Sequence, residues 1–244
     1  MNFQRLLLAL AGLCLSPGVW ATTYSYTGPL YTSTTDFTPP CGTGPCADYA
    51  LGQRISGQFT TAAPLPPNLV SPDAHASVTS YSFTDGVNTY SSSDPNTRFS
   101  IFAISTDVAG NIIAASSEVQ IQLWQSGSNP HTAGARAAVF DACSGSCGGL
   151  GGDHVDNNFI CTSVQVSGGG GGNIDADTCA GGSGDPSTSA ASVTAGSTGT
   201  WSTLAPQQSS SIPTLSEWAL ILLSLLVAGF AVRALSLRSR RKFP

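Results

Sequence analysis

Charged side chains are scarce in this chain of 244 residues, where they make up 9% of the sequence. An average soluble protein has about 25%. Positive charge is scarcest in the middle: the span from Asp36 to Glu217 holds all fourteen acidic residues but only Arg54, Arg98 and Arg136, a net charge of −11. A nucleic-acid-binding surface needs a basic face to contact phosphates. The acidic span therefore excludes nucleic acid from the expected partners.

Residue types that common catalytic sites need are also few. Only His75, His131 and His154 are available as the base of a nucleophilic site, and no serine stands in a G-x-S-x-G elbow. Glu118 and Glu217 are the only glutamates. We therefore expect no enzymatic activity. A secreted hydrolase that uses His154 or paired acids remains an alternative.

The N-terminus has the pattern of a secretory signal peptide. Arg5 provides the positive charge, "LLLALAGLCL" is a short apolar run, and "VWA" ends at Ala21 with side chains that suit a signal peptidase. The run is too short for a retained anchor and "SPG" interrupts it. Residues 1–21 are therefore predicted to be removed after Ala21.

Six cysteines remain after this cleavage, and an even number in an exported chain predicts up to three disulfides. Six cysteines allow fifteen connectivities. The simplest connectivity joins nearest neighbours, namely Cys41–Cys46, Cys143–Cys147 and Cys161–Cys179. A zinc site is the alternative. The C-x4-C and C-x3-C spacings and the lack of a nearby histidine disfavour it.

Hydrophobic residues between positions 54 and 142 alternate with a period of two, as in half-buried strands. Turn signals separate these segments, which favours an all-β fold, namely an antiparallel, jelly-roll-like β-sandwich. Asp85-Gly86 is typical of a two-residue hairpin loop, which would place Tyr81 opposite Tyr90. The expected core residues are Ile55, Phe59, Phe83, Phe99, Ile101, Phe102, Ile104, Val119, Ile121, Leu123 and Phe140.

The sandwich core is predicted over residues 22–142. Residues 143–204 form a Gly/Cys/Asp-rich extension that we expect to add one or two strands, and 205–211 is a polar linker. The extension contains four aspartates that suit Ca²⁺, which prefers oxygen ligands: Asp153, Asp156, Asp175 and Asp177. No EF-hand pattern is present, and the same residues are ordinary in solvated turns. A calcium- or carbohydrate-binding surface module is thus a second alternative.

Residues 218–237 are apolar apart from Arg233. Twenty helical residues span about 30 Å, the thickness of a bilayer core. This segment is therefore predicted to be a transmembrane helix. The basic end, residues 238–244, contains Arg238, Arg240, Arg241 and Lys242 and is predicted to stay in the cytoplasm. Together with Arg233, these residues are predicted to fix the topology and stop transfer.

The sequence "IPTLSEW" precedes the apolar segment. Thr214 and Glu217 match a capping box, in which the two side chains satisfy backbone N–H groups at a helix start. Pro213 keeps Ile212 out of that helix. Capping explains Thr214 and Glu217 but not the identities of Ile212, Leu215 and Trp218.

This tail resembles the IPTL-CTERM sorting domain, a relative of the PEP-CTERM tails of Gram-negative bacteria. The resemblance rests on the motif Ile212, Pro213, Thr214, Leu215, Ser216, Glu217 and Trp218, then a single apolar span, then a basic end. It implies recognition and cleavage by an exosortase-like membrane enzyme. It also implies release to the cell surface or matrix, with exopolysaccharide as a partner there. We therefore expect a structural or adhesive surface protein without a cofactor.

Overall fold

The computed structural model describes residues 21–71, 73–143, 152–167, 175–197, 199–204, 222–227, 230 and 233. The chain divides into two compact units, Met1–Pro206 and Gln207–Pro244. Each unit is described by itself below.

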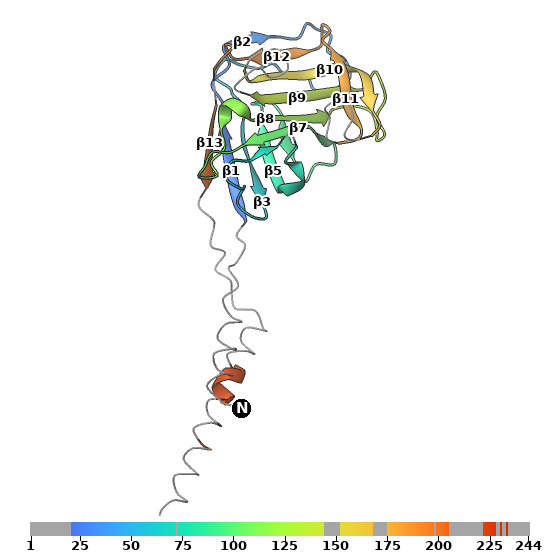
Figure 1. Cartoon of the computed structure of the whole chain (residues 1–244). Helices are drawn as coiled ribbons and strands as arrows, with labels where there is room; N and C mark the ends of the chain where they lie inside the picture. The colour runs from blue at the N-terminus through green and yellow to red at the C-terminus, as the bar shows by residue number, and fades with distance from the viewer. Residues whose placement is uncertain are drawn as a thin grey trace, which may run out of the picture. The chain divides into compact units, whose positions relative to one another are not determined.

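The first unit consists of antiparallel β-strands (Figure 1). In chain order they are β1 (Thr22–Thr27), β2 (Ser33–Thr35), β3 (Ser56–Thr61), β4 (Val70–Ser71), β5 (Val78–Thr84), β6 (Thr89–Ser91), β7 (Thr97–Ser105), β8 (Glu118–Trp124), β9 (Arg136–Cys143), β10 (His154–Gln165), β11 (Thr178–Ser183), β12 (Ser189–Ser192) and β13 (Thr200–Leu204). Short 3-10 helices lie at His75–Ser77 and Ala114–Ser116.

These strands form two sheets. The small sheet has five strands in the order β13-β1-β3-β5-β6. The large sheet has eight, in the order β2-β12-β10-β9-β8-β7-β4, with β11 pairing to β10 beside this row. The predicted all-β, antiparallel fold is confirmed.

Aromatic rings pack between the two sheets. The ring of Phe59 on β3 lies 4.9 Å from that of Phe102 on β7, and the ring of Phe83 on β5 lies 5.3 Å from that of Phe140 on β9. Of the expected core residues, only Ile101 and Leu123 are half-buried rather than buried. At Ile101 the reason is a register shift between Phe99 and Ile101, which lets both Phe99 and Phe102 face the core.

The finer expectation of a jelly roll is not met. Strands β7, β8, β9 and β10 follow one another as neighbours, which is a meander, whereas a jelly roll is built from Greek keys. Consecutive strands pair in this way when the connections between them are short enough to join adjacent antiparallel strands.

The predicted two-residue hairpin at Asp85-Gly86 is wrong. Phe83 pairs with Tyr90, and Thr84 pairs with Thr89, so four residues form the loop. The loop widens because the buried Asp85 turns inward. Its carboxylate accepts hydrogen bonds from the backbone N–H groups of Val87 (2.8 Å) and Asn88 (2.6 Å) and from the Tyr90 hydroxyl (2.7 Å).

Residues 143–204 add more strands than the one or two expected. They supply β10, β11 and β12 to the large sheet, and β13, which pairs with β1 in the small sheet. The sequences of β11 and β12, "TCAGGS" and "SAAS", contain small residues without hydrophobic alternation. Pattern reading therefore missed them, although the extension is an integral part of both sheets.

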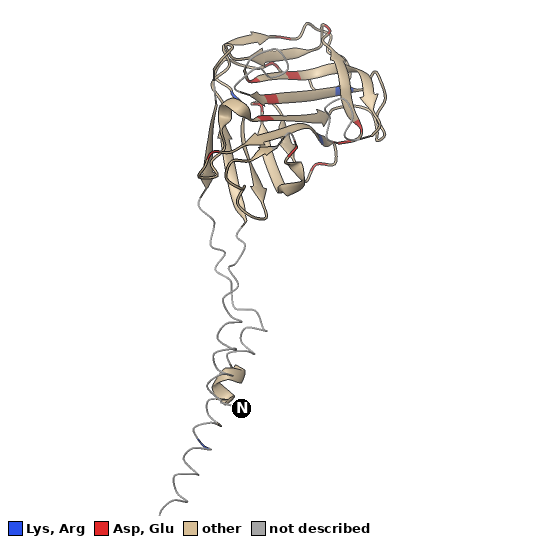
Figure 2. Ribbon diagram, viewed as in Figure 1, with Lys and Arg blue, Asp and Glu red and all other residues tan. Residues whose placement is uncertain are grey.

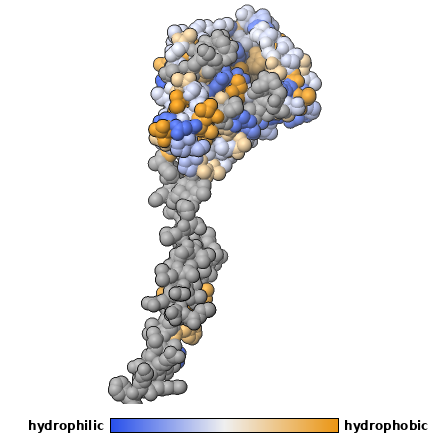
Figure 3. Space-filling model, viewed as in Figure 1, coloured by the Kyte–Doolittle hydropathy of each residue, from blue (hydrophilic) through white to orange (hydrophobic). Residues whose placement is uncertain are grey.

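In the second unit, residues 222–227 are helical. The described residues of this unit are mostly hydrophobic (Figure 3). They contain no helix that is both long and apolar enough to cross a membrane. Most of the predicted span, 218–237, lies outside the described residues, as does the whole linker 205–211.

The inter-sheet core makes a stability prediction. The fully buried Phe59 ring contacts the rings of Tyr24, Phe102 and Trp201, so Phe59→Ala is expected to lower the free energy of unfolding by about 3–5 kcal/mol. The neighbouring Gln58 is exposed, and Gln58→Ala should change the free energy of unfolding by less than about 0.5 kcal/mol. Urea unfolding followed by tryptophan fluorescence measures both. Equal effects of the two substitutions would contradict this packing.

Candidate functional site

Most of the residues predicted to act in sorting lie outside the described part of the chain. This applies to Ile212 through Trp218 and to Arg238, Arg240, Arg241 and Lys242. Arg233 is described as an exposed helical position. Ala21, the predicted cleavage residue, is exposed and directly precedes β1, and residues 1–20 are not described.

Two predicted disulfides are confirmed. Cys41 is bonded to Cys46, and Cys161 is bonded to Cys179. The second of these joins β10 to β11. Cys143 is disulfide-bonded as well, while Cys147, its predicted partner, lies outside the described residues.

Three of the four aspartates predicted as calcium ligands, Asp153, Asp175 and Asp177, accept hydrogen bonds from other groups of the protein. Asp153 is fully buried, and its Oδ1 accepts hydrogen bonds from the Tyr26 hydroxyl (2.6 Å) and the Cys143 N–H (3.0 Å). Burial raises the pKa of Asp153 to about 6, although these two hydrogen bonds oppose the shift. Burial and the nearby Asp153 carboxylate raise the pKa of Tyr26 well above its usual range.

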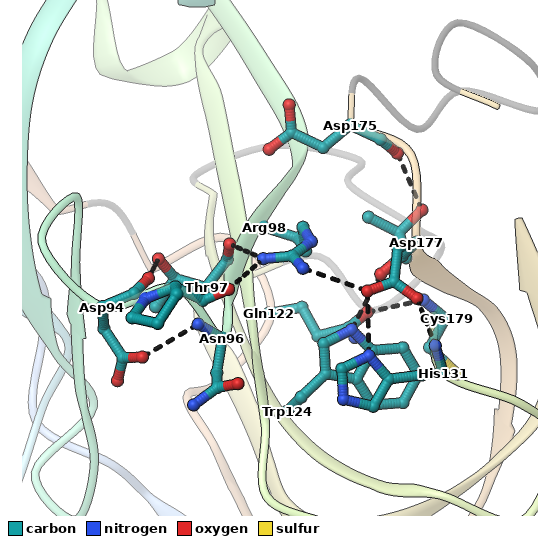
Figure 4. Close-up of polar contacts among 12 residues, drawn as sticks. Asp94, Asn96, Thr97, Arg98, Gln122, Trp124, His131, Asp175, Asp177 and Cys179 are labelled. Atoms are coloured by element: carbon teal, nitrogen blue, oxygen red, sulfur yellow. Dashed lines mark hydrogen bonds and ion pairs between the residues drawn. The ribbon is translucent and has the colours of Figure 1, made fainter. Parts of the chain in front are cut away.

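Asp175 and Asp177 directly precede β11 in the chain. Their carboxylates accept hydrogen bonds from β7 and from the β8–β9 connection. Asp175 accepts a hydrogen bond from the Phe99 N–H at 2.7 Å. Asp177 has a positive φ of 59° and accepts from the His131 N–H (2.7 Å), from His131 Nδ1 (2.8 Å) and from an Arg98 guanidinium nitrogen (3.0 Å). Figure 4 shows the side chains of Arg98 and His131 converging on the Asp177 carboxylate.

Trp124 completes this arrangement. Its indole N–H donates to the backbone carbonyl of Asp177 at 2.7 Å, and its ring stacks on the His131 ring with centroids 4.2 Å apart. Burial acts to raise the pKa of Asp177, but hydrogen bonds from His131 and Arg98 outweigh it and hold that pKa below its usual value. We name the set Arg98, Trp124, His131 and Asp177 the Asp177 clasp, because it joins β7, β8 and the β8–β9 connection to the start of β11.

The predicted convergence of Asp153, Asp156, Asp175 and Asp177 on one metal ion is not found. Across the described residues there is no group of three or more His, Cys, Asp or Glu side chains arranged to hold a metal ion. Their spacing in the sequence predicts that these aspartates cluster in neighbouring loops. In the structure, Asp153 points toward Tyr26 of the small sheet, while Asp177 belongs to the clasp at β11.

The outer face of the large sheet, opposite the core, carries a row of polar side chains. The strand register places His154 beside Asp141, Asp141 beside Gln120, and Asp156 beside Val139. Figure 2 shows acidic positions following one another across β10, β9 and β8. His154 Nδ1 lies 4.0 Å from Asp141 Oδ2, and Gln120 donates to the same carboxylate at 3.3 Å.

This environment shifts several pKa values. Burial, with a contribution from the negative charge of Glu118, raises the pKa of Asp141 to about 8. Burial also raises the pKa of Glu118 and of Asp156, and lowers that of His154. Asp141 therefore keeps its proton at neutral pH. A protonated carboxyl beside a neutral imidazole can donate a hydrogen bond that a carboxylate cannot.

Comparison with known families identifies the tail. Residues 210–241 match the model of the IPTL-CTERM motif. The chain carries an IPTL-CTERM motif. This motif is a C-terminal sorting signal, which implies an exported surface protein and processing by an exosortase-like membrane enzyme. No curated protein and no solved structure matches the chain.

Sequence reasoning found the IPTL-CTERM tail but missed the polar outer face. Asp141 lies within the predicted strand "RAAVFDA" and Gln122 within "EVQIQLW", where alternation indicates only an outward-facing side chain. Nothing in that pattern reveals that Asp141 and Gln122 are 1% exposed in the folded protein. That burial depends on packing between distant segments.

The raised pKa of Asp141 predicts how stability depends on pH. The folded state keeps this proton up to about pH 8, whereas the unfolded chain loses it near 3.8. The folded state thus binds more protons in this window, so stability falls as pH rises from about 4 to 8. Asp141→Asn should flatten this fall, as measured by Tm from pH 4 to 9.

The exposed Asp36 offers a matched control, since Asp36→Asn should leave the pH profile unchanged. His154 also affects the pH profile: because its pKa is lowered in the folded state, stability falls as the pH drops through its titration. Since His154 is present in every variant, the difference between the pH profiles reports the contribution of Asp141. A profile of Asp141→Asn that parallels the unsubstituted protein over the whole range would refute the buried, protonated carboxyl.

Proposed function

We propose that this protein is an exported cell-surface or matrix protein of structural or adhesive type, whose C-terminal tail is cut by an exosortase-like enzyme. The observation that carries the proposal is the IPTL-CTERM motif at residues 210–241. In the precursor, residues 218–237 cross the membrane as a helix. The basic end holds the orientation, because positively charged flanks stay in the cytoplasm.

Two features of the first unit support this role. Cys41–Cys46 and Cys161–Cys179 are disulfides of a kind that persists in oxidising compartments outside the cytoplasm. Thr23 of β1 pairs with Leu204 of β13, so the predicted signal peptide and the tail join the sheets at neighbouring points.

The residues between Leu204 and Ile212 give the enzyme access to the motif. An extended chain of this length reaches at most about 25 Å. A cut in or near the motif would separate the folded unit from the hydrophobic segment and the basic end. The role of the released unit is structural or adhesive rather than catalytic in this proposal.

A substitution series in the tail tests the sorting mechanism. Thr214→Ser keeps a hydroxyl for the capping box and should be processed normally. Leu215→Ala and Trp218→Ala leave the capping box in place but remove side chains that the capping box does not use. They should leave the intact precursor in the membrane fraction, as detected by an antibody against the first unit after cell fractionation. Normal release of both alanine variants would contradict recognition of the motif.

A further inference from the structure

Two hollows lie side by side on the outer face of the large sheet. The first has a volume of about 210 Å³ and is lined by β2, β10 and β12, including Thr35, His154, Asp156 and Ser192. The second has a volume of about 260 Å³ and lies between β11 and the strands β7 to β10. Asp156 lines both hollows, so the two adjoin at this residue and together cross the strands of the large sheet. We call this the outer trough.

Buried polar groups along the outer trough lack partners. Gln122, which is 1% exposed, lines the second hollow; its Oε1 accepts from the Cys179 N–H at 2.8 Å, while its Nε2 has no hydrogen-bond partner. His154 Nδ1, in the first hollow, also lacks a hydrogen-bond partner. An unsatisfied buried polar group costs about 1–3 kcal/mol. A ligand that supplies the missing partners would therefore be stabilised at this face.

Charge along the trough selects against anions. Asp156 lines both hollows, Glu118 lies on the same face, and among the described residues neither Lys nor Arg lines either hollow. The nearby arginines are occupied elsewhere: Arg98 pairs with Asp177 at 3.0 Å and Arg136 with Asp185 at 2.7 Å. A phosphate, sulfate or uronate group would meet negative charge without a counter-ion.

The remaining lining groups suit hydroxyls. Hydroxyls line the trough at Ser33, Thr35, Ser192 and Ser100, and the amides of Gln120 and Gln122 both donate and accept hydrogen bonds. Phe159 adds one apolar ring to the second hollow. We propose that the outer trough binds an uncharged oligosaccharide chain, whose hydroxyls pair with these groups and whose length follows the trough across the strands.

The wall of the second hollow is fixed before any ligand arrives. The Cys161–Cys179 disulfide and the Asp177 clasp both hold β11 against the large sheet. Gly182 on β11 passes so close to the Phe159 ring that a Cβ at this position would overlap it. A preorganised wall lowers the entropy cost of binding. This site does not depend on sorting of the tail.

Isothermal titration of the full-length chain in detergent tests the proposal. The ligands are hexasaccharides of glucose, xylose and mannose, all uncharged, and a hexamer of galacturonate as the anionic comparison. At least one uncharged hexasaccharide should bind, and more tightly than the galacturonate hexamer. Gln120→Ala and Asp156→Ala should each weaken that binding about three- to tenfold, the worth of one hydrogen bond.

Two further variants make the result specific to the trough. Ala190→Trp places a large ring in the first hollow, where Ala190 is half-buried, and should abolish binding. Gln58→Ala removes a glutamine side chain from the outer face of the small sheet instead, and should leave the affinity for the oligosaccharide unchanged. Thermal melting confirms that each variant is folded. Failure of every uncharged hexasaccharide to bind, tighter binding of galacturonate, or unchanged affinity in folded Ala190→Trp would overturn the proposal.

Discussion

The packing of aromatic rings between the two sheets determines the rest of the first unit. Phe59, Phe83, Phe102 and Phe140 bury one face of each sheet. Successive side chains of a strand point to opposite faces, so this burial sends the intervening residues outward. On β8, the placement of Val119 and Ile121 in the core therefore puts Glu118, Gln120 and Gln122 on the outer face. The outer trough is a consequence of this alternation in neighbouring strands.

The outer face departs from the usual solvent-exposed side of an antiparallel sheet because β11 is held against it. The Asp177 clasp and the Cys161–Cys179 bond fix β11, and Gln122 accepts a hydrogen bond from the Cys179 N–H. Residues that alternation alone would expose are thereby buried. This burial leaves Gln122 Nε2 without a hydrogen-bond partner. Asp141 on β9 is buried as well, and that burial raises its pKa.

The sequence predicts the fold class well because residues 54–142 contain clear alternation, and nine of the eleven expected core residues are buried. It predicts poorly where long-range polar contacts decide the geometry. Asp85-Gly86 indicates a two-residue loop by local preference, but the buried Asp85 carboxylate collects donors from its own loop and from Tyr49 and Tyr90. The glycine-rich β11 gives no hydrophobic signal, since its position depends on Asp177 and on a disulfide. The sorting tail could be read directly because a contiguous motif, rather than tertiary structure, defines it.

The protein joins a folded, disulfide-bonded unit to a C-terminal sorting motif. If the tail is cut in or near this motif, the mature protein lacks the hydrophobic segment and the basic end. Mass spectrometry of the protein recovered from the cell surface, with identification of its last peptide, tests this claim most directly. We expect a C-terminus near Ile212 and an N-terminus at Thr22. Recovery of surface protein whose last peptide includes Arg240 and Arg241 would contradict it.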